Sequence, residues 1–149
     1  MEEKNKAWKT VSSKYLFRRP WLTVRCEDML LPNGNHIPEY YILEYPDWVN
    51  TIAITKDGKF VFVRQYRPGL GRTSYELCAG VCDKEDASPL VSAQRELWEE
   101  TGYGKGNWRE YMVISANPST HTNLTHCFLA TDVEPIDHQH LEDTEDLSV

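Results

Sequence analysis

Most of the chain shows alternating or continuous short apolar runs of the kind that form strands. Two dipeptides typical of tight hairpin turns, Asn33-Gly34 and Asp57-Gly58, each separate a pair of such runs. Segments later in the chain repeat the pattern at shorter length. We therefore predict strands at residues 20–31, 37–45, 49–55, 59–66, 76–80, 111–115 and 125–131.

One segment breaks this pattern and predicts a helix over residues 89–101, with the sequence PLVSAQRELWEET. Ser88 is a favoured N-cap residue, and Pro89 fits the first helical position. Gly102 stands where a left-handed residue commonly ends a helix. A single helix among many strands indicates a mixed α+β order.

The predicted helix carries three glutamates, Glu96, Glu99 and Glu100, at spacings that make them neighbours on the helix surface. Like charges placed in this way repel one another. A divalent ion such as Mg²⁺ prefers a cluster of hard oxygen ligands and would neutralise this repulsion. The helix therefore predicts a metal site.

Composition adds several limits. The 149 residues fit one domain, and the net charge of −7 comes entirely from the acidic stretch 132–149. The remaining residues carry equal numbers of acids and bases, so we expect no nucleic-acid partner. No apolar run approaches the roughly 18 residues of a membrane span, so we expect no membrane association. Four cysteines without a Cys-x-x-Cys pair favour a reducing compartment, and we expect the cytoplasm.

The segment from Gly80 to Tyr103 resembles the Nudix box, the signature of Nudix hydrolases. That box reads Gly, five residues, Glu, seven residues, Arg-Glu, apolar, any, Glu-Glu, any, Gly, apolar. The second half, beginning at Arg95, matches at every fixed position. In the first half, Asp86 with Glu85 beside it stands where the box has glutamate, and one additional residue precedes the helix. The resemblance implies the Nudix α/β/α sandwich, with a mixed sheet, the box helix and an N-terminal antiparallel strand region.

Two further segments are similar to ADP-ribose pyrophosphatases and related nucleoside-diphosphate-sugar hydrolases. Residues 63–67 contain Gln-Tyr-Arg, and residues 76–80 read Glu-Leu-Cys-Ala-Gly, with Cys78 in place of a proline. The resemblance implies Mg²⁺-dependent, or Mn²⁺-dependent, hydrolysis of the pyrophosphate bond of an ADP-sugar such as ADP-ribose, giving AMP and a sugar phosphate. Two alternatives stay open: hydrolysis of another nucleoside-diphosphate sugar such as GDP-mannose, and a catalytically silent Nudix module that senses a ligand.

The resemblance also assigns roles near the metal. Glu96, Glu99 and Glu100 are the implied metal carboxylates, and the backbone carbonyl of Ala79 is a further implied ligand. We expect Arg95 to pair with one of the clustered or loop acids and to hold it in place. The catalytic base is implied to be Glu145, in a late acidic loop at 141–147, although Glu99 or Glu100 would supply the base in other Nudix enzymes. A solvated acidic tail is the alternative interpretation of that loop.

Three residues are candidates for substrate binding. A guanidinium grips phosphate at two points, so Arg67 is expected to meet phosphate or ribose, with a structural ion pair as the alternative. Glu76 is expected to bond the substrate or to pair with Arg67. Asn123 lies in a polar segment, 117–126, that we expect to border the pocket. His138 and His140 are expected to be solvated loop residues, because two histidines alone do not make a metal site.

The resemblance finally suggests the organisation of the chain as a single Nudix domain over residues 1–149. Relatives dimerise by exchanging N-terminal strands, so residues 8–45 are expected to form a dimerisation subregion of a homodimer. Relatives also usually continue with another strand and a helix. The C-terminus therefore looks short, and we expect the loop that carries Glu145 to be poorly anchored.

Overall fold

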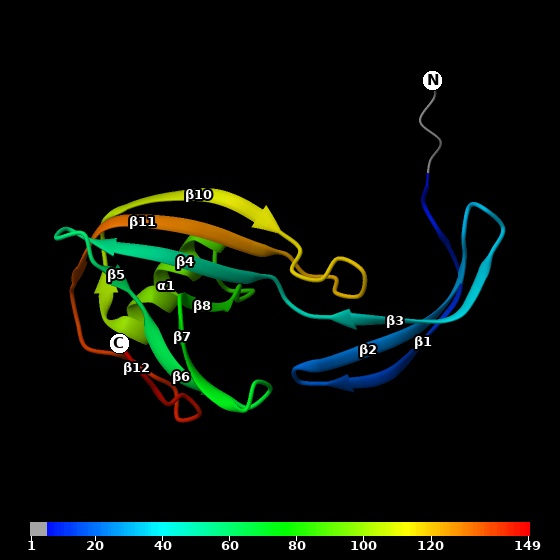
Figure 1. Ribbon diagram of the computed structural model, residues 1–149, viewed down its shortest axis with the longest axis horizontal. Helices are drawn as coiled ribbons and strands as arrows, with labels where there is room; N and C mark the ends of the chain where they lie inside the picture. The colour runs from blue at the N-terminus through cyan, green and yellow to red at the C-terminus, as the bar shows by residue number, and fades with distance from the viewer. Residues whose placement is uncertain (1–5) are drawn as a thin grey trace, which may run out of the picture. The chain divides into compact units, whose positions relative to one another are not determined.

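The computed structural model describes residues 6–149, which form two compact units (Figure 1). Unit 1 contains the chain up to Tyr45 together with Ser115–Asn123. Unit 2 contains Pro46–Ile114 and Leu124–Val149. The expected subregion 8–45 corresponds to the strands of unit 1, and the expected single domain over the whole chain stays a prediction.

Unit 1 is a three-stranded antiparallel sheet in the order β1-β2-β3, with β1 at Lys9–Arg19, β2 at Leu22–Leu30 and β3 at His36–Glu44. The predicted Asn33-Gly34 turn joins β2 to β3, and Gly34 has the positive φ of 87° that favours glycine. Segment 115–123 docks on β3 through backbone hydrogen bonds, including one of 2.8 Å from Leu43 N to Thr120 O.

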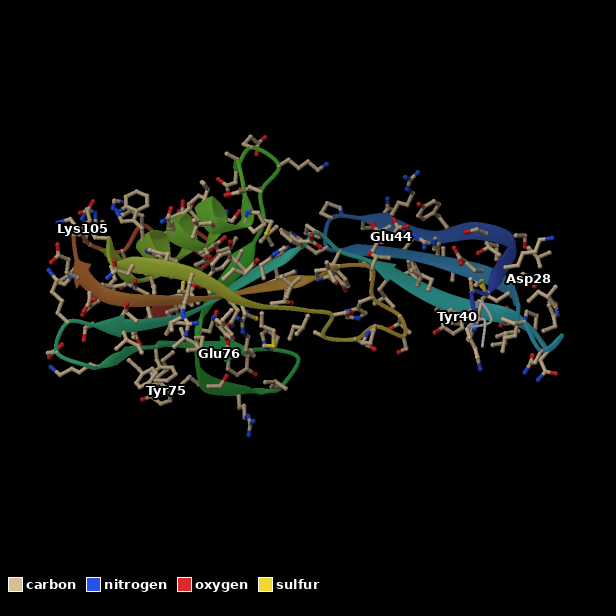
Figure 2. The ribbon with its side chains drawn as sticks, turned by 90° about the horizontal axis from the view of Figure 1, so that it is seen from above. Asp28, Tyr40, Glu44, Tyr75, Glu76 and Lys105 are labelled. Atoms are coloured by element: carbon tan, nitrogen blue, oxygen red, sulfur yellow. The ribbon has the colours of Figure 1, made fainter. Side chains whose placement is uncertain are left out.

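Few side chains of unit 1 are buried, and one of them is a charged group. Glu27 is 8% exposed, and its carboxylate accepts a 2.6 Å hydrogen bond from Arg25 Nε. Arg25 also pairs with Glu44, which Figure 2 labels. A buried carboxylate needs such partners to avoid a large desolvation penalty. Strand β1 is exposed along its whole length.

Unit 2 is built around a mixed sheet. Its main order is β10-β11-β4-β5, and β11 pairs with β4 in parallel while the other pairs are antiparallel. The strands are β4 at Trp48–Thr55, β5 at Phe60–Val61, β10 at Asn107–Ile114 and β11 at Thr125–Pro135, with β8 at Cys78–Val81 on β4 and β9 at Tyr103–Gly104 on β11. A second sheet has the order β12-β6-β7, with β6 at Val63–Arg67, β7 at Arg72–Glu76 and β12 at Leu147–Ser148.

Helix α1 spans Pro89–Thr101, and its predicted ends are confirmed. The Ser88 side chain accepts a hydrogen bond from Val91 N, and Gly102 is left-handed with φ 72°. The stripe that faces the sheet includes Ala93 and Leu97, both 0% exposed, which pack in apolar clusters with residues of β4, β8 and β11. No helix within residues 6–149 has the length and apolar character that a membrane crossing requires.

Several elements differ from the sequence-based expectation. Strand β1 and the short strands β7, β9 and β12 were not predicted. The expectation of a poorly anchored C-terminal loop is wrong, because β12 pairs with β6 and Leu147 is only 9% exposed. The α+β class and the mixed sheet are confirmed, and among the described residues α1 is the one helix.

Candidate active site

The acidic face of α1 begins in the core of unit 2. Ala93, Leu97 and Glu100 follow one another at helical spacing, so the Glu100 carboxylate emerges on the same stripe as two core residues. Glu100 is 4% exposed, and one of its oxygens accepts a 3.2 Å hydrogen bond from Ala79 N of strand β8. The helix therefore directs one acid into the sheet rather than toward solvent.

Arg95 connects the elements that surround this acid. Its guanidinium donates to Asp86 Oδ2 at 3.0 and 3.1 Å, to Glu96 Oε1 at 3.0 Å and to Glu99 Oε2 at 2.9 Å. It also donates to the carbonyl oxygen of Val81 at 3.1 Å. One cation thus joins the loop before α1, strand β8 and the acidic face of the helix.

The pKa of Arg95 follows from these contacts. Burial alone would lower the pKa of this guanidinium, but the hydrogen bonds to Asp86 and Glu99 outweigh that effect and raise it above the ordinary value. The positive charge is therefore fixed at this position. Of the two loop acids that the sequence left open, Asp86 accepts the hydrogen bonds of Arg95 and Glu85 is exposed. Asp83 Oδ2 also lies 3.7 Å from Arg95 Nη2.

Strand β8 leaves just enough room for Glu96. A Cβ atom added to Gly80 would overlap the carboxylate of Glu96, so a larger residue at this position of the strand would displace that carboxylate from its present place. The glycine that opens the box therefore has a steric reason: it lets the helix acid lie directly against the backbone of β8.

Burial raises the pKa of two helix acids. Desolvation raises the pKa of Glu100 to about 7, with smaller contributions from the nearby charges of Glu96 and Glu145. Desolvation also raises the pKa of Glu96, although Arg95 opposes the rise. Carboxylates in this condition hold their protons more tightly than carboxylates in water. A cation beside them would restore the ionised form.

The three predicted metal carboxylates share a region of α1 but do not converge on one point. Among the described residues, the ligand oxygens of Glu96, Glu99 and Glu100 do not all lie within 4.8 Å of one another. Arg95 holds Glu96 and Glu99, while Glu100 contacts β8. The donors are nevertheless hard carboxylate oxygens, and the pKa is raised for buried Glu100 and half-buried Glu96. This set fits a divalent metal ion.

The acidic loop at 141–146 lies within electrostatic range of the helix acids. Desolvation is the main cause of the raised pKa values of Glu96 and Glu100, and the negative charge of Glu145 is a smaller cause. Glu145 closes a small turn, in which Glu142 N donates to its carboxylate at 3.0 Å. Strand β12 ties the end of this loop to β6. The loop is therefore part of the folded unit.

The β6–β7 hairpin positions the two predicted substrate residues as an ion pair. Arg67 Nε and Nη2 donate to Glu76 Oε2 at 2.9 and 2.7 Å, and Ser74 Oγ donates to the same carboxylate. The Arg67 guanidinium lowers the pKa of Glu76. Arg67 and Glu76 therefore form an ion pair in this structure. The Arg67 side chain is 41% exposed, so its contact with substrate stays a prediction.

Asn123 is not brought to this cluster by the fold of unit 2, because it belongs to segment 115–123 of unit 1. Its proposed contact with substrate stays a prediction. The other predicted site residues all lie in unit 2: the three helix acids and Arg95 on α1, Ala79 on β8, Arg67 and Glu76 on the hairpin, and Glu145 in the acidic loop.

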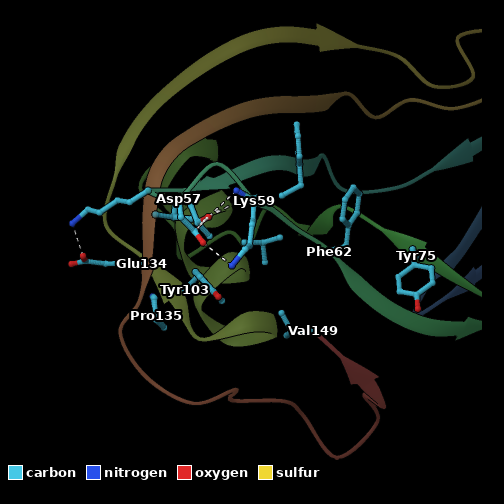
Figure 3. A pocket seen from close by; sticks show the side chains of 13 residues that line it. Asp57, Lys59, Phe62, Tyr75, Tyr103, Glu134, Pro135 and Val149 are labelled. Carbon is cyan, nitrogen blue, oxygen red and sulfur yellow. Dashed lines mark hydrogen bonds and ion pairs between the residues drawn. The ribbon is translucent and has the colours of Figure 1, made fainter.

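A cavity of about 510 Å³ lies elsewhere in unit 2 (Figure 3). Its walls come from the β4–β5 hairpin, β9 and the end of β11, and they include Lys59, Phe62, Tyr75 and Val149. None of the predicted catalytic or metal residues lines it. The carboxylate cluster is therefore a separate feature of the surface.

Sequence reasoning missed two features of the site. Cys78, seen there as a departure from the usual proline, is 1% exposed, and its thiol interacts with the carboxylate of Glu100. The carbonyl of Val81 accepts from Arg95, a contact that no side-chain pattern signals. The residue pattern predicted a strand at 76–80, but it gave no sign of these two contacts.

The raised pKa of Glu100 predicts how the stability of the metal-free protein depends on pH. Between the ordinary value of 4.5 and about 7, the unfolded chain has lost a proton that the folded protein retains. The unfolding free energy should therefore fall by about 1–3 kcal/mol as the pH rises through this window. Urea denaturation in the presence of EDTA measures the fall. Glu100→Gln should flatten it, and parallel profiles for the two proteins would contradict the assignment.

Comparison with known proteins agrees with this geometry. Residues 45–148 match the NUDIX domain, and residues 8–43 match the nucleoside diphosphate sugar hydrolase N-terminal domain. A solved structure titled as an ADP compounds hydrolase superposes with a TM-score of 0.84, covering 99% of this chain and 78% of that one, at 22% identity. That likeness confirms the fold.

Three relatives are similar in sequence. An ADP-ribose pyrophosphatase of Bacillus subtilis is 32% identical over 87% of this chain and 69% of its own length. A methanol dehydrogenase activator of Bacillus methanolicus is 33% identical over 82% of this chain and 65% of its own length. A GDP-mannose pyrophosphatase of Escherichia coli is 35% identical over 51% of this chain and 42% of its own length.

The chain thus spans about two thirds of the length of the first two relatives and less than half of the third. The family match covers more than half of the chain and includes the whole carboxylate cluster, the Arg95 contacts and the Gly80 position. The chain belongs to the Nudix hydrolase family.

Proposed function

We propose that the protein hydrolyses the pyrophosphate bond of an ADP-sugar such as ADP-ribose, giving AMP and a sugar phosphate. The observation that carries the proposal is the acidic face of α1, where Arg95 holds Glu96 and Glu99 while the Glu100 carboxylate is buried against β8. The match of residues 8–43 to a nucleoside diphosphate sugar hydrolase domain and the ADP-ribose pyrophosphatase relative support the substrate class.

Magnesium is the proposed cofactor, with manganese as a substitute, because both prefer hard oxygen donors. Glu96, Glu99, Glu100 and the carbonyl of Ala79 would hold it. When bound, the ion would neutralise charge on the pyrophosphate oxygens during in-line attack by water. Arg95 positions Glu96 and Glu99 through its hydrogen bonds, and this keeps the donors in place without a contact to substrate.

The remaining chemistry falls to groups around the helix. Glu145 is the proposed base that takes a proton from the attacking water, and its position on a loop anchored by β12 supports this role. Glu99 or Glu100 is the alternative base. Arg67 is the proposed phosphate ligand, because its exposed guanidinium has hydrogen-bonding capacity beyond the pair with Glu76. Asn123 and Glu76 are proposed to contact substrate polar groups.

Localisation and assembly are proposals as well. The four cysteines of the chain are free thiols, which supports a location in the reducing cytoplasm.

A homodimer is supported by the apolar side chains on β1: Val11, Tyr15 and Phe17 are 55%, 45% and 54% exposed. An edge strand that exposes several apolar side chains invites pairing with a second copy. The proposed partners are thus a nucleotide-sugar substrate and a second copy of the chain.

The activity is tested with ADP-ribose and Mg²⁺, measuring AMP release. We expect turnover by the wild-type protein and a loss of more than about 100-fold in kcat/KM for Glu99→Gln, because the helix then lacks one metal carboxylate. Glu85→Gln is the matched control. It removes an exposed acid from the adjoining loop, so its activity should equal that of the wild type.

The same assay separates the alternatives. Turnover of GDP-mannose but not of ADP-ribose would overturn the ADP-sugar assignment. It would favour hydrolysis of GDP-mannose, the substrate in the name of the Escherichia coli relative. Binding of nucleotide sugars without turnover of any of them would favour the ligand-sensing module.

The dimer is tested by light scattering. We expect a mass of twice the 17.3 kDa chain for the wild type and a monomer for Phe17→Glu, because a charge on β1 opposes pairing. Tyr75→Glu is the matched control, since Tyr75 is a 75% exposed aromatic residue on β7 of unit 2. A monomeric wild type, or equal dissociation by both variants, would contradict the proposal.

A further inference from the structure

The side chains of Asp137, His138 and His140 gather at the C-terminal end of α1. The chain leaves β11 and returns across the helix end, where Ile136 N donates to Gly102 O at 2.9 Å and His140 N donates to Glu99 O at 2.8 Å. Gln139 Nε2 donates to Glu100 O at 2.7 Å. These bonds satisfy carbonyl groups that a helix end leaves without partners. They also fix segment 136–140 at the end of α1.

The fixed segment brings Asp137, His138 and His140 together. His138 Nδ1 lies 2.7 Å from Asp137 Oδ1, and His140 Nε2 lies 2.9 Å from Asp137 Oδ2. The candidate ligand atoms of the three residues all lie within 4.8 Å of one another. Zinc bonds nitrogen and oxygen at about 2.0–2.2 Å, which places neighbouring donors of a tetrahedral site about 3.3 Å apart. The cluster needs only small side-chain movements to reach that spacing.

One of the two rings is already held in position. The His140 ring stacks on Trp98, with centroids 4.2 Å apart and an interplanar angle of 29°. The His138 ring lies 4.4 Å from His140, and its side chain is 80% exposed. Stacking and the backbone bond to Glu99 reduce the conformational freedom that His140 would lose on binding a ligand. The cluster is therefore largely preorganised and open to solvent.

We propose that Asp137, His138 and His140 bind a transition-metal ion of the Zn²⁺ class at a site distinct from the α1 carboxylates. Two imidazoles and one carboxylate suit zinc, nickel or copper, whereas magnesium prefers oxygen donors alone. Three protein ligands leave a position for water. Two histidines alone do not make a metal site, so none was predicted at His138 and His140 from the sequence. In the structure Asp137, which directly precedes His138, lies beside both rings as a third ligand.

A bound ion at this position would crosslink the segment that precedes the acidic loop. Asp137 follows β11, and His140 immediately precedes the loop that carries Glu145. Because His140 also contacts Trp98 and the Glu99 carbonyl, the ion would strengthen the attachment of that loop to the end of α1. The site is thus a clamp on the loop, and it supplies no group to the acidic face of the helix.

The test is calorimetric titration of Zn²⁺ into tag-free, EDTA-treated and dialysed protein in excess Mg²⁺. We expect one Zn²⁺ equivalent that is retained in Glu99→Gln. His138→Ala should weaken that equivalent by at least about tenfold, because one of three ligands is lost. This side chain is mostly exposed, so the variant should fold normally, as circular dichroism would verify.

His36→Ala is the matched control. His36 is a half-exposed histidine that pairs with a single carboxylate, Asp28, in unit 1, so its removal should leave Zn²⁺ affinity unchanged. Three results would overturn the proposal: no Zn²⁺ binding in excess Mg²⁺, equal affinity in the wild type and His138→Ala, or loss of the only Zn²⁺ equivalent in Glu99→Gln. The last result would assign the ion to the helix acids.

Discussion

The Arg95 guanidinium is the contact on which the architecture of the acidic site depends. It donates to Asp86 in the loop, to the Val81 carbonyl on β8, and to Glu96 and Glu99 on α1. Charge-assisted hydrogen bonds of this kind are roughly twice as strong as neutral ones. The additional residue in the loop is tolerated because Asp86 still reaches the guanidinium. Loop, strand and helix are therefore fixed relative to one another by a single side chain.

This arrangement places Glu96 and Glu100 where the ionised form of a carboxyl group is disfavoured. Glu100 occupies a core-facing position of α1, and the carboxylate of Glu96 lies directly against Gly80 of β8. Desolvation raises the pKa of both carboxyl groups. A helix selected only for stability would place apolar or exposed residues at these positions. Such local conflicts concentrate at functional sites, where a ligand removes the cost.

Local signals explain what the sequence predicted well. Ser88, Pro89 and Gly102 determine the ends of α1 through short-range geometry, and the resemblance of the box identified its acids. Sequence alone did not distinguish Glu85 from Asp86, because the choice depends on which side chain the folded loop turns toward Arg95. Strand β1 escaped prediction because it is exposed on every residue and lacks a clear alternation of buried positions.

Features made by distant segments were beyond the sequence pattern. Leu147 lies in an acidic stretch, yet in β12 it pairs with Gln65 of the neighbouring strand β6 and so anchors the loop. The segment that carries Asp137, His138 and His140 is held at the end of α1 by backbone bonds to Gly102 and Glu99. Asn123 lies in a segment that folds with the strands of unit 1, and its contact with substrate stays a prediction. Each case depends on tertiary contacts rather than on local propensity.

We propose that Glu96, Glu99 and Glu100 of α1, of which Glu100 is buried, hold a divalent cation. The most direct measurement is the melting temperature near pH 7.5 with EDTA and with saturating Mg²⁺, for the wild type and Glu100→Gln. Binding to the folded state alone raises stability, so Mg²⁺ should raise the Tm of the wild type by several degrees and that of the variant much less. Equal shifts in the two proteins, or no shift in the wild type, would contradict the account.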